Sequence, residues 1–391
     1  MTDTPSSGRL HIVLTGERNS GKSSLLNALS GQRVSIVSDV PGTTTDHVSK
    51  AMEIPGLGAC VLVDTAGLDD TGDLGGMRVG NALDAIRTAD ILLLVIDAAT
   101  GRLPDMPLMG VPAVPVLNKC DLLDPPALKE LSESAKAKYG RPAVLSSPMF
   151  GRGLRDVIYA VQESVPEDWN APLLTAGLVK EGGLVVLVMP QDKQAPKGRL
   201  ILPQQQVIRE LLDRHCRVVC CTTGDLASTL ASLKDVPDVV ITDSQDFAAV
   251  SKAVPQGVRL TSFSILLAAS KGDIDYFLES ARKIDSLTAS SRVLVAEACT
   301  HVPASEDIGR VRIPRLLRAR AGKDLRIDTV SGRDFPDDIR AYDLVIHCGA
   351  CMFNRRYVLS RVEQAKKQGV PMTNYGIAIA YINNLKNIYT K

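Results

Sequence analysis

The sequence predicts an α/β protein of three parallel-sheet domains, and two observations support this. Short, nearly continuous apolar runs alternate with helical stretches over residues 9–165: LHIVLTG, ACVLVDTAG, ILLLVIDA, AVPVLNKCD and AVLSSP. Such runs are typical of parallel strands that helices cover on both faces. In addition, 391 residues are too many for one ordinary core. We expect domains at residues 1–168, 169–262 and 263–391, the first of them a doubly wound sheet.

Two further series of strands and helices follow a predicted linker near residues 166–172. The second series contains GLVVLVMP, a helix beginning near Pro203, and then CRVVCCT, DVVITD and GVRLTSF. The third contains a helix around DIDYFLESARKI, the strands SRVLVAEAC, LRIDTV and YDLVIHC, and a basic helix, NRRYVLSRVEQAKKQG. Each series is long enough for a small α/β unit of its own.

Composition narrows the functional classes. Apolar residues make up 45% and charged residues 23% of the chain, as in ordinary globular proteins. The formal net charge of +1 provides no electrostatic footprint for nucleic acid or an anionic membrane. The apolar run ILLLVIDAA is too short to span a bilayer, so we expect a cytoplasmic protein. In that reducing compartment the eight cysteines would be thiols or metal ligands.

The stretch GERNSGKSS follows an apolar strand and precedes the helical LLNALS. This places G-x-x-x-x-G-K-S between a strand and a helix, where it forms a phosphate-binding loop. Gly16 and Gly21 allow backbone N–H groups to turn towards the β-phosphate at a helix N-terminus. Lys22 would reach the β- and γ-phosphate oxygens, and the Ser23 hydroxyl would bind Mg²⁺.

Three more stretches identify the nucleotide as GTP. In VDTAG, Asp64 would hold Mg²⁺ through water, and Gly67 would offer its N–H to the γ-phosphate. In LNKCD, Asp121 can accept both guanine N1–H and N2–H₂ while Asn118 braces the loop. Thr44, in PGTTTD, would complete the magnesium shell. The expected nucleotide-binding set is Gly16, Asn19, Ser20, Gly21, Lys22, Ser23, Ser24, Thr43, Thr44, Asp64, Gly67, Asn118, Lys119, Asp121, Ser146 and Ser147.

The order and spacing of these motifs resemble the translation-factor class of P-loop small GTPases. Within it they are most similar to the branch of tRNA-modification and ribosome-assembly GTPases, which implies GTP hydrolysis. Leu68 follows DTAG where Ras-like proteins carry the glutamine that orients water, so we expect slow hydrolysis. At the last guanine motif, Ser147 and Pro148 follow Ser146 in place of the usual alanine and lysine, which is expected to weaken affinity.

Asn19 allows two interpretations. It matches the asparagine with which potassium-stimulated members of this branch hold K⁺ beside the phosphates, where the cation adds positive charge. Alternatively, Asn19 is a polar loop residue that tolerates left-handed backbone geometry.

Two clusters in the third domain combine cysteine and histidine at strand ends. VLVAEACTHVP contains Cys299 and His301, and YDLVIHCGACMF contains His347, Cys348 and Cys351. If the two strands are neighbours, the cysteines converge at the carboxyl edge of the sheet. Three cysteines and a histidine would complete a structural zinc site. Three thiolates could instead hold three irons of a four-iron–four-sulfur cluster. The residues alone leave both open.

The remaining cysteines have a structural interpretation. Cys216, Cys220 and Cys221 lie in the apolar strand CRVVCC, and Cys60 and Cys120 also lie in or beside apolar runs. Cysteine is among the residue types most often buried, so we expect these five in the core. The middle domain shows no catalytic constellation, and dimerisation is its expected role.

The arrangement C-x-H, forty-five residues, then H-C-x-x-C, behind such a GTPase domain, resembles the hydrogenase maturation GTPase family HydF. APKGRLILPQQQVIRELL, beginning at Ala195, is also similar to that family's middle-domain entry. The resemblance implies GTP-binding, dimerisation and cluster-binding domains. It also implies that Cys299, Cys348 and Cys351 bind a 4Fe–4S cluster. His301 and His347 are then candidates for the fourth iron or for nearby hydrogen bonds, and Asp192 is a further candidate ligand.

The same resemblance implies a scaffold and carrier whose carrier role is not itself catalytic. It would receive a two-iron unit bearing CO, cyanide and a dithiol bridge, made with the radical-SAM maturases HydE and HydG. It would deliver that unit to apo FeFe-hydrogenase as a homodimer, with GTP controlling association. The alternative is a tRNA-modification or ribosome-assembly GTPase with a zinc-binding C-terminal domain. A third class, an electron-transfer protein, would normally need four fixed thiolates to keep its cluster, and the two clusters contain only three cysteines.

Overall fold

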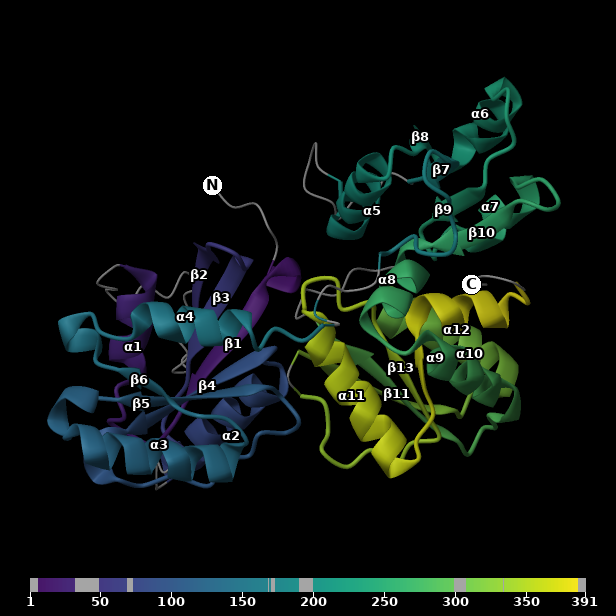
Figure 1. Cartoon of the computed structure of the whole chain (residues 1–391). Coiled ribbons are helices and arrows are strands. Elements are labelled where there is room, and N and C mark those ends of the chain that lie inside the picture. The colour runs from purple at the N-terminus through teal and green to yellow at the C-terminus, as the bar shows by residue number, and fades with distance from the viewer. Residues whose placement is uncertain are drawn as a thin grey trace. The chain divides into compact units, whose positions relative to one another are not determined.

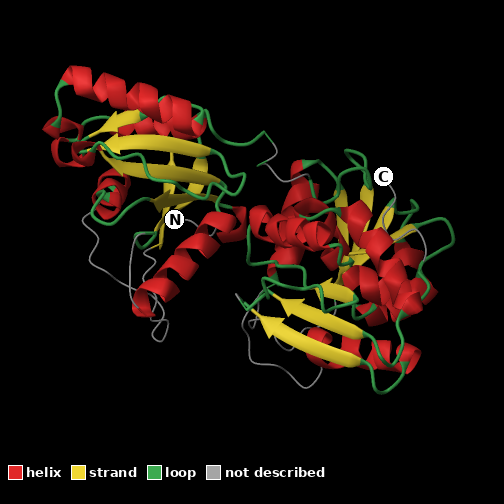
Figure 2. Ribbon diagram, turned by 90° about the horizontal axis from the view of Figure 1, so that it is seen from below, coloured by secondary structure: helices red, strands yellow, loops and turns green. Residues whose placement is uncertain are grey.

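The computed structural model describes residues 6–31, 49–68, 73–167, 169, 173–189, 200–298, 307–332 and 334–385. The chain divides into two compact units, Met1–Asn170 and Ala171–Lys391 (Figure 1). Sheets flanked by helices make up both units, which confirms the predicted α/β class (Figure 2). The limits expected at residues 168 and 262 stay predictions. Within the described ranges, no helix is both long and apolar enough to cross a membrane.

The first unit contains a six-stranded sheet, counted over its described residues, in the order β2-β3-β1-β4-β5-β6. All neighbouring strands are parallel except β2, which is antiparallel to β3. The strands are β1 (Leu10–Thr15), β2 (Ser49–Ile54), β3 (Gly58–Asp64), β4 (Ile91–Asp97), β5 (Ala113–Asn118) and β6 (Val144–Ser146). The α-helices are α1 (Lys22–Ser30), α2 (Asp73–Arg87), α3 (Pro125–Tyr139) and α4 (Leu154–Gln162).

Both faces of this sheet are covered because its central strands are apolar on both sides. In β1, Ile12 and Leu14 pack with α1 and α4, whereas Val13 packs with α2 on the opposite face. The sequence analysis did not predict β2. Its side chains alternate between exposed and half-buried positions at the sheet edge, so it has no continuous apolar run.

The second unit holds two four-stranded parallel sheets among its described residues. The first has the order β10-β9-β7-β8. Its strands are β7 (Leu184–Val188), β8 (Arg217–Cys221), β9 (Val239–Thr242) and β10 (Arg259–Ser262). The helices of this part are α5 (Leu202–Asp213), α6 (Leu226–Ser232), α7 (Phe247–Ala253) and α8 (Phe263–Lys271).

The other sheet has the order β12-β11-β13-β14. Its strands are β11 (Arg292–Glu297), β12 (Arg326–Ser331), β13 (Leu344–His347) and β14 (Met372–Asn374). Its helices are α9 (Ile274–Ala281), α10 (Ile313–Ala321), α11 (Arg355–Gln368) and α12 (Tyr375–Ile382). Helices α9 and α11 pack on one face of this sheet and α10 packs on the other, while α12 contributes side chains to both cores.

Helix α8 belongs to both cores of the second unit. Phe263 and Leu266 pack in the core of the β7–β10 sheet, whereas Ile265 and Ala268 pack in the core of the β11–β14 sheet. Because one short helix is buried on both sides, it provides a rigid link between the two sheets.

The prediction that five cysteines lie in the core is only partly correct. Cys60 and Cys216 are buried, and burial raises the pKa of the Cys60 thiol to about 11. Cys220 is exposed, and Cys120 and Cys221 are half-buried. The error for Cys220 follows from the position of β8 at the edge of its sheet, where no residue of the strand is fully buried.

Candidate nucleotide and metal-cluster sites

The phosphate loop connects β1 to α1, and its geometry requires glycine at two positions. Gly21 has φ 90°, and a Cβ there would lie 2.1 Å from Asn118 Nδ2. A Cβ at Gly16 would lie 2.2 Å from the Val95 carbonyl oxygen. Any larger residue at either position would therefore push the loop away from β4 and β5.

The groups predicted to bind phosphate and magnesium lie together at this loop. Lys22 is buried, and its Nζ donates to the carbonyl oxygens of Gly16 at 3.1 Å and Glu17 at 2.8 Å. Ser23 Oγ donates to Asp64 Oδ2 at 2.5 Å, so two predicted magnesium partners from different motifs meet. Gly67 is buried just beyond β3, and Ser24 is exposed on the first turn of α1.

The predicted guanine motif LNKCD donates two hydrogen bonds to the phosphate loop. Asn118 Nδ2 donates to the Ser20 carbonyl at 2.8 Å, and Lys119 Nζ donates to the Asn19 carbonyl at 2.8 Å. Lys119 also pairs with Asp97 Oδ2 at 2.6 Å. Asp97 was not predicted, although it ends the apolar run ILLLVID. It holds Lys119 across the base-binding region.

Several polar atoms in this region fit a bound guanine nucleotide. Ser147 Oγ donates to Asp121 Oδ1 at 2.5 Å, which places the last guanine motif beside the carboxylate that would bind the base. Ser20 Oγ, Asn118 Oδ1 and Ser146 Oγ are buried without a hydrogen-bond partner among the described residues. Buried polar atoms normally have partners, so these three are suited to a polar ligand.

Two predictions about hydrolysis can be compared with the structure. Leu68 packs against the core that includes Val13 and Leu92, so an apolar residue occupies this position. Asn19 has φ 61°, the left-handed geometry that the structural interpretation of this residue requires. This φ value is compatible with K⁺ binding too, so both interpretations remain. Thr43 and Thr44 lie outside the described residues.

The cysteine loop follows β13 at the carboxyl edge of the β11–β14 sheet. Strands β11 and β13 are parallel neighbours, with Ala296 opposite His347, so the two predicted strand ends do meet. Cys348 Sγ accepts hydrogen bonds from the N–H groups of Ala298 at 3.0 Å and Ala350 at 3.4 Å. Ala350 has φ 45°, and this turn lies between the two cysteines of the C-x-x-C motif.

The predicted third cysteine, Cys299, directly follows Ala298 in the chain. Cys299, His301 and Asp192 all lie outside the described residues, so their predicted roles are not tested. Within the described ranges no group of three His, Cys, Asp or Glu side chains could hold a metal ion. The described chain therefore provides two of the three expected thiolates.

Cys348 and Cys351 line one cavity of ≈ 360 Å³, together with Glu297 and Tyr375. Burial raises the pKa of the Cys348 thiol, and the N–H groups of Ala298 and Ala350 oppose this by stabilising the thiolate. Hydrogen bonds to sulfur are among the means by which proteins tune iron–sulfur clusters. Two sulfurs on one cavity, one of them bound by two N–H groups, fit such a cluster.

A buried lysine that the sequence analysis missed supports the cysteine loop. Lys271, the last residue of α8, donates from Nζ to the carbonyl oxygens of Ala350 at 2.9 Å, Cys351 at 3.3 Å and Phe353 at 2.7 Å. Its side chain comes from the helix that the two sheets share. No local sequence pattern relates Lys271 to a loop some eighty residues later.

His347 lies behind the loop, with both ring nitrogens in hydrogen bonds. Nδ1 lies 2.6 Å from the Cys348 carbonyl oxygen, and Nε2 lies 2.8 Å from Arg361 Nη1. We assign Nδ1 as the donor and Nε2 as the acceptor, since a guanidinium can only donate. Burial and the charge of Arg361 lower the pKa of His347 to about 3. Of its two predicted roles, this geometry favours hydrogen bonding beside the site over iron ligation.

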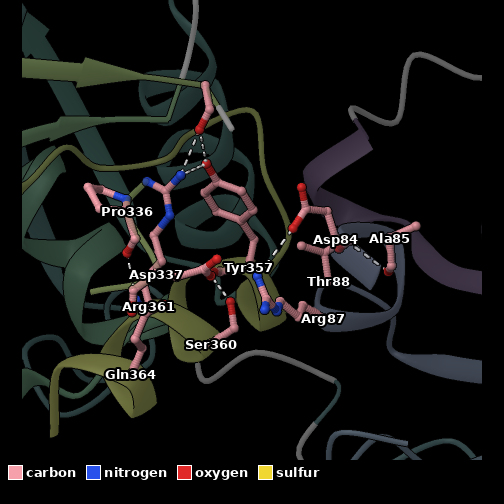
Figure 3. Close-up of polar contacts among 11 residues, drawn as sticks. Asp84, Ala85, Arg87, Thr88, Pro336, Asp337, Tyr357, Ser360, Arg361 and Gln364 are labelled. Carbon is pink, nitrogen blue, oxygen red and sulfur yellow. Dashed lines mark hydrogen bonds and ion pairs between the residues drawn. The ribbon is translucent and has the colours of Figure 1, made fainter. Parts of the chain in front are cut away.

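Arg361 is held in place on α11 by aromatic rings and by a backbone carbonyl. Its guanidinium carbon lies 4.3 Å from the centre of the Tyr357 ring and 4.6 Å from that of Phe335. Nη2 donates to the Gly332 carbonyl at 2.7 Å and also to the Tyr357 hydroxyl (Figure 3). Through His347, the rigid Arg361 fixes the Cys348 carbonyl.

Three family models match the chain, and two of them decide its identity. Residues 174–272 match the hydrogen maturase F dimerization domain, and residues 275–388 match the hydrogen maturase F tetramerization domain. Residues 11–119 match the 50S ribosome-binding GTPase model. The chain belongs to the hydrogen maturase F (HydF) family. Its matched models describe a GTPase domain, a dimerization domain and a tetramerization domain, which confirms the family resemblance drawn from the motifs.

Curated relatives resemble only part of this HydF protein. The tRNA modification GTPase MnmE of Nitrosomonas europaea is 31% identical over 235 residues, which cover 56% of this chain and 49% of the relative. MnmE of Moorella thermoacetica is 38% identical over 162 residues, 40% of this chain and 35% of the relative. The chain thus spans about half or less of the length of these relatives.

Solved GTPase structures are also similar to part of the chain. Aquifex aeolicus Era bound to GDP and AlF4⁻ is 21% identical, with a TM-score of 0.36, and the match covers 54% of this chain and 93% of Era. The G domain of the T. maritima FeoB iron transporter is 21% identical, with a TM-score of 0.31. That match covers 40% of this chain and 99% of the G-domain chain.

Proposed function

We propose that this HydF protein is a GTP-regulated scaffold and carrier. It holds a 4Fe–4S cluster on Cys299, Cys348 and Cys351, and it delivers a two-iron unit to apo FeFe-hydrogenase. The observation that carries the proposal is the cysteine loop: two sulfurs on one cavity, with two backbone N–H groups directed at Cys348 Sγ. One of these donors, Ala298, directly precedes Cys299 in the chain.

The protein's own groups divide the work at this site. A cluster held by three thiolates would supply one iron whose remaining ligand is exchangeable. Lys271 and His347 hold the carbonyl groups of the loop, which keeps the two cysteines in a fixed relation. The cavity beside the sulfurs gives room for cargo and limits its contact with water.

The nucleotide region has a regulatory role in this proposal. GTP binds with Mg²⁺ on Ser23 and Asp64, with Thr44 completing the shell, and hydrolysis is slow because Leu68 cannot orient water. K⁺ at Asn19 would stimulate it. The nucleotide state controls association with partners. GTP can shift the balance between two conformations of the protein only by as much as its affinities for them differ.

Two radical-SAM maturases, HydE and HydG, supply the cargo in this proposal, and the protein works as a homodimer or a larger oligomer. The net charge of +1 supports partners other than nucleic acid or membranes. The tRNA-modification alternative has support only from the GTPase domain. The second unit instead matches the two hydrogen maturase F models.

The test is activation of apo FeFe-hydrogenase by the purified protein carrying the two-iron unit. Cys348→Ala should abolish activation, because it removes a thiolate that lines the cavity. Cys220→Ala is the matched control, since this exposed thiol lies on edge strand β8. Full activation by Cys348→Ala would contradict the proposal.

A further inference from the structure

Tyr375 has an unusual place beside the cysteine loop. It directly follows β14, in which Asn374 is paired with His347, and so it starts at the same sheet edge as Cys348. The residue is 8% exposed and lines the cavity that Cys348 and Cys351 also line. Its hydroxyl is buried and has no hydrogen-bond partner among the described residues. A buried donor in this state destabilises a protein unless a ligand satisfies it.

The groups around this hydroxyl form a shaped polar site. An added Cβ at Gly309 would lie 2.1 Å from Tyr375 Oη and 2.7 Å from Glu297 Oε1, so both oxygens lie against this glycine. Glu297 Oε2 accepts from Arg310 Nε at 3.1 Å and Nη2 at 3.0 Å, and from Ser331 Oγ. Arg310 therefore balances the charge of the Glu297 carboxylate. Asp243 and Asp307 also line the cavity, and Asp307 Oδ1 accepts a hydrogen bond from the backbone N–H of Arg310.

We propose that Tyr375 Oη donates a hydrogen bond to an anionic acceptor ligand of the two-iron cargo and so orients the cargo beside Cys348 and Cys351. This inference rests on the proposed function. The acceptor is a terminal cyanide nitrogen, because it carries negative charge and a lone pair directed outward, whereas carbon monoxide bound to iron is a poor acceptor. A phenol suits this role, since at neutral pH it keeps its proton. Tyr375 is thus a positioning residue that selects cargo bearing cyanide.

The experiment uses full-length protein with its iron–sulfur cluster reconstituted anaerobically. It is incubated with a synthetic dithiolate-bridged diiron complex carrying carbonyl and cyanide ligands, desalted, and measured by infrared spectroscopy. Tyr375→Phe removes only the hydroxyl, so a cyanide stretching band should move away from its wild-type position. The cargo retained should also fall roughly fivefold to tenfold. Tyr381→Phe is the matched control on the same helix, because that hydroxyl bonds Asp285, and it should leave the bands in place.

Gly309→Ala is the second variant, in case Tyr375→Phe alters the fold. Its methyl group would displace the Tyr375 hydroxyl, so it should shift the same cyanide band. If wild-type protein retains the complex but both variants match it in band position and retention, the inference is wrong and the carrier proposal stands. If wild-type protein retains no complex at all, both the inference and the proposed function are overturned.

Discussion

The nucleotide region and the cysteine region occupy the same place in two different sheets, the carboxyl edge of parallel strands. They differ in how they are held. In the nucleotide region the supporting contacts join the recognised motifs to each other, as Ser23 meets Asp64 and Asn118 meets Ser20. In the cysteine region an important support comes from outside the motif: Lys271 lies 79 residues before Ala350. A phosphate loop carries its own geometry, whereas this cysteine loop depends on the surrounding fold.

The largest expected effect isolates the nucleotide region. Lys22→Ala should lower GTP turnover by roughly 10²–10³-fold, because it removes the cation that stabilises charge on the transferred phosphate. The iron content after reconstitution should not change, since the cysteine loop has separate supports. Turnover and iron assays measure the two effects, with exposed Lys129→Ala as the control. A parallel loss of iron would show that the two regions are not independently held.

The next effect tests the support of the cysteine loop from outside its motif. Lys271→Met should reduce the free energy of unfolding by about 3 kcal/mol, because three carbonyl groups lose one buried cationic donor. It should also lower the iron content, which Lys22→Ala does not. Lys252→Met, on the exposed face of α7, is the matched control. Denaturant unfolding measures the change in stability, and an iron assay measures binding. If Lys271→Met binds as much iron as wild-type protein, the loop keeps its shape without Lys271.

A smaller effect concerns His347 in metal-free protein. Because burial and Arg361 lower its pKa from 6.5 to about 3, the unfolded chain takes up a proton near pH 6.5 that the folded chain does not. This neutral histidine contributes fully to stability above pH 6.5, and the contribution falls as the pH drops towards 3. The loss should reach about 2 kcal/mol at pH 5. In His347→Gln this part of the pH dependence should vanish. If urea unfolding shows that the free energy of unfolding changes with pH as steeply in the variant as in wild-type protein, the assignment is wrong.

The smallest effect decides between the two interpretations of Asn19. Asn19→Gly keeps a backbone that adopts φ 61° readily but removes the amide oxygen. If that oxygen holds K⁺, the stimulation of GTP turnover by K⁺ over Na⁺ should fall roughly tenfold, equivalent to about 1.4 kcal/mol. Unchanged stimulation in the glycine variant would leave only the structural role. Asn19→Asp is the matched control, because it keeps a side-chain oxygen at the same position. Asn27→Gly would be a poor control, because Asn27 lies within helix α1.

The sequence predicted most where local chemistry decides structure. The phosphate loop, VDTAG and LNKCD each follow an apolar strand, and the structure brings Lys22, Asp64 and Asn118 to one sheet edge. Strand β2 was missed because its side chains only alternate. Cys220 was wrongly placed in the core because the strand order, which makes β8 an edge, depends on the whole chain.

In the cysteine region, the sequence identified the C-x-x-C motif but not its supports. Lys271 looks like an ordinary helix-terminal lysine, and Arg361 like one of many charges on a basic helix. Tyr375 lies directly after β14, a strand of three residues that was not predicted. Each acquires its role only when α8, α11 and β14 pack around the loop, and no spacing in the sequence records that packing.

The most direct test of the central claim is EPR spectroscopy of protein reconstituted anaerobically with iron and sulfide and reduced with dithionite. The account predicts a reduced four-iron–four-sulfur signal in wild-type protein and in Cys220→Ala. The signal should be absent from Cys299→Ala and from Cys348→Ala. Wild-type protein that gives no signal and instead holds stoichiometric zinc would contradict the account, because the cysteine region would then be a closed structural site.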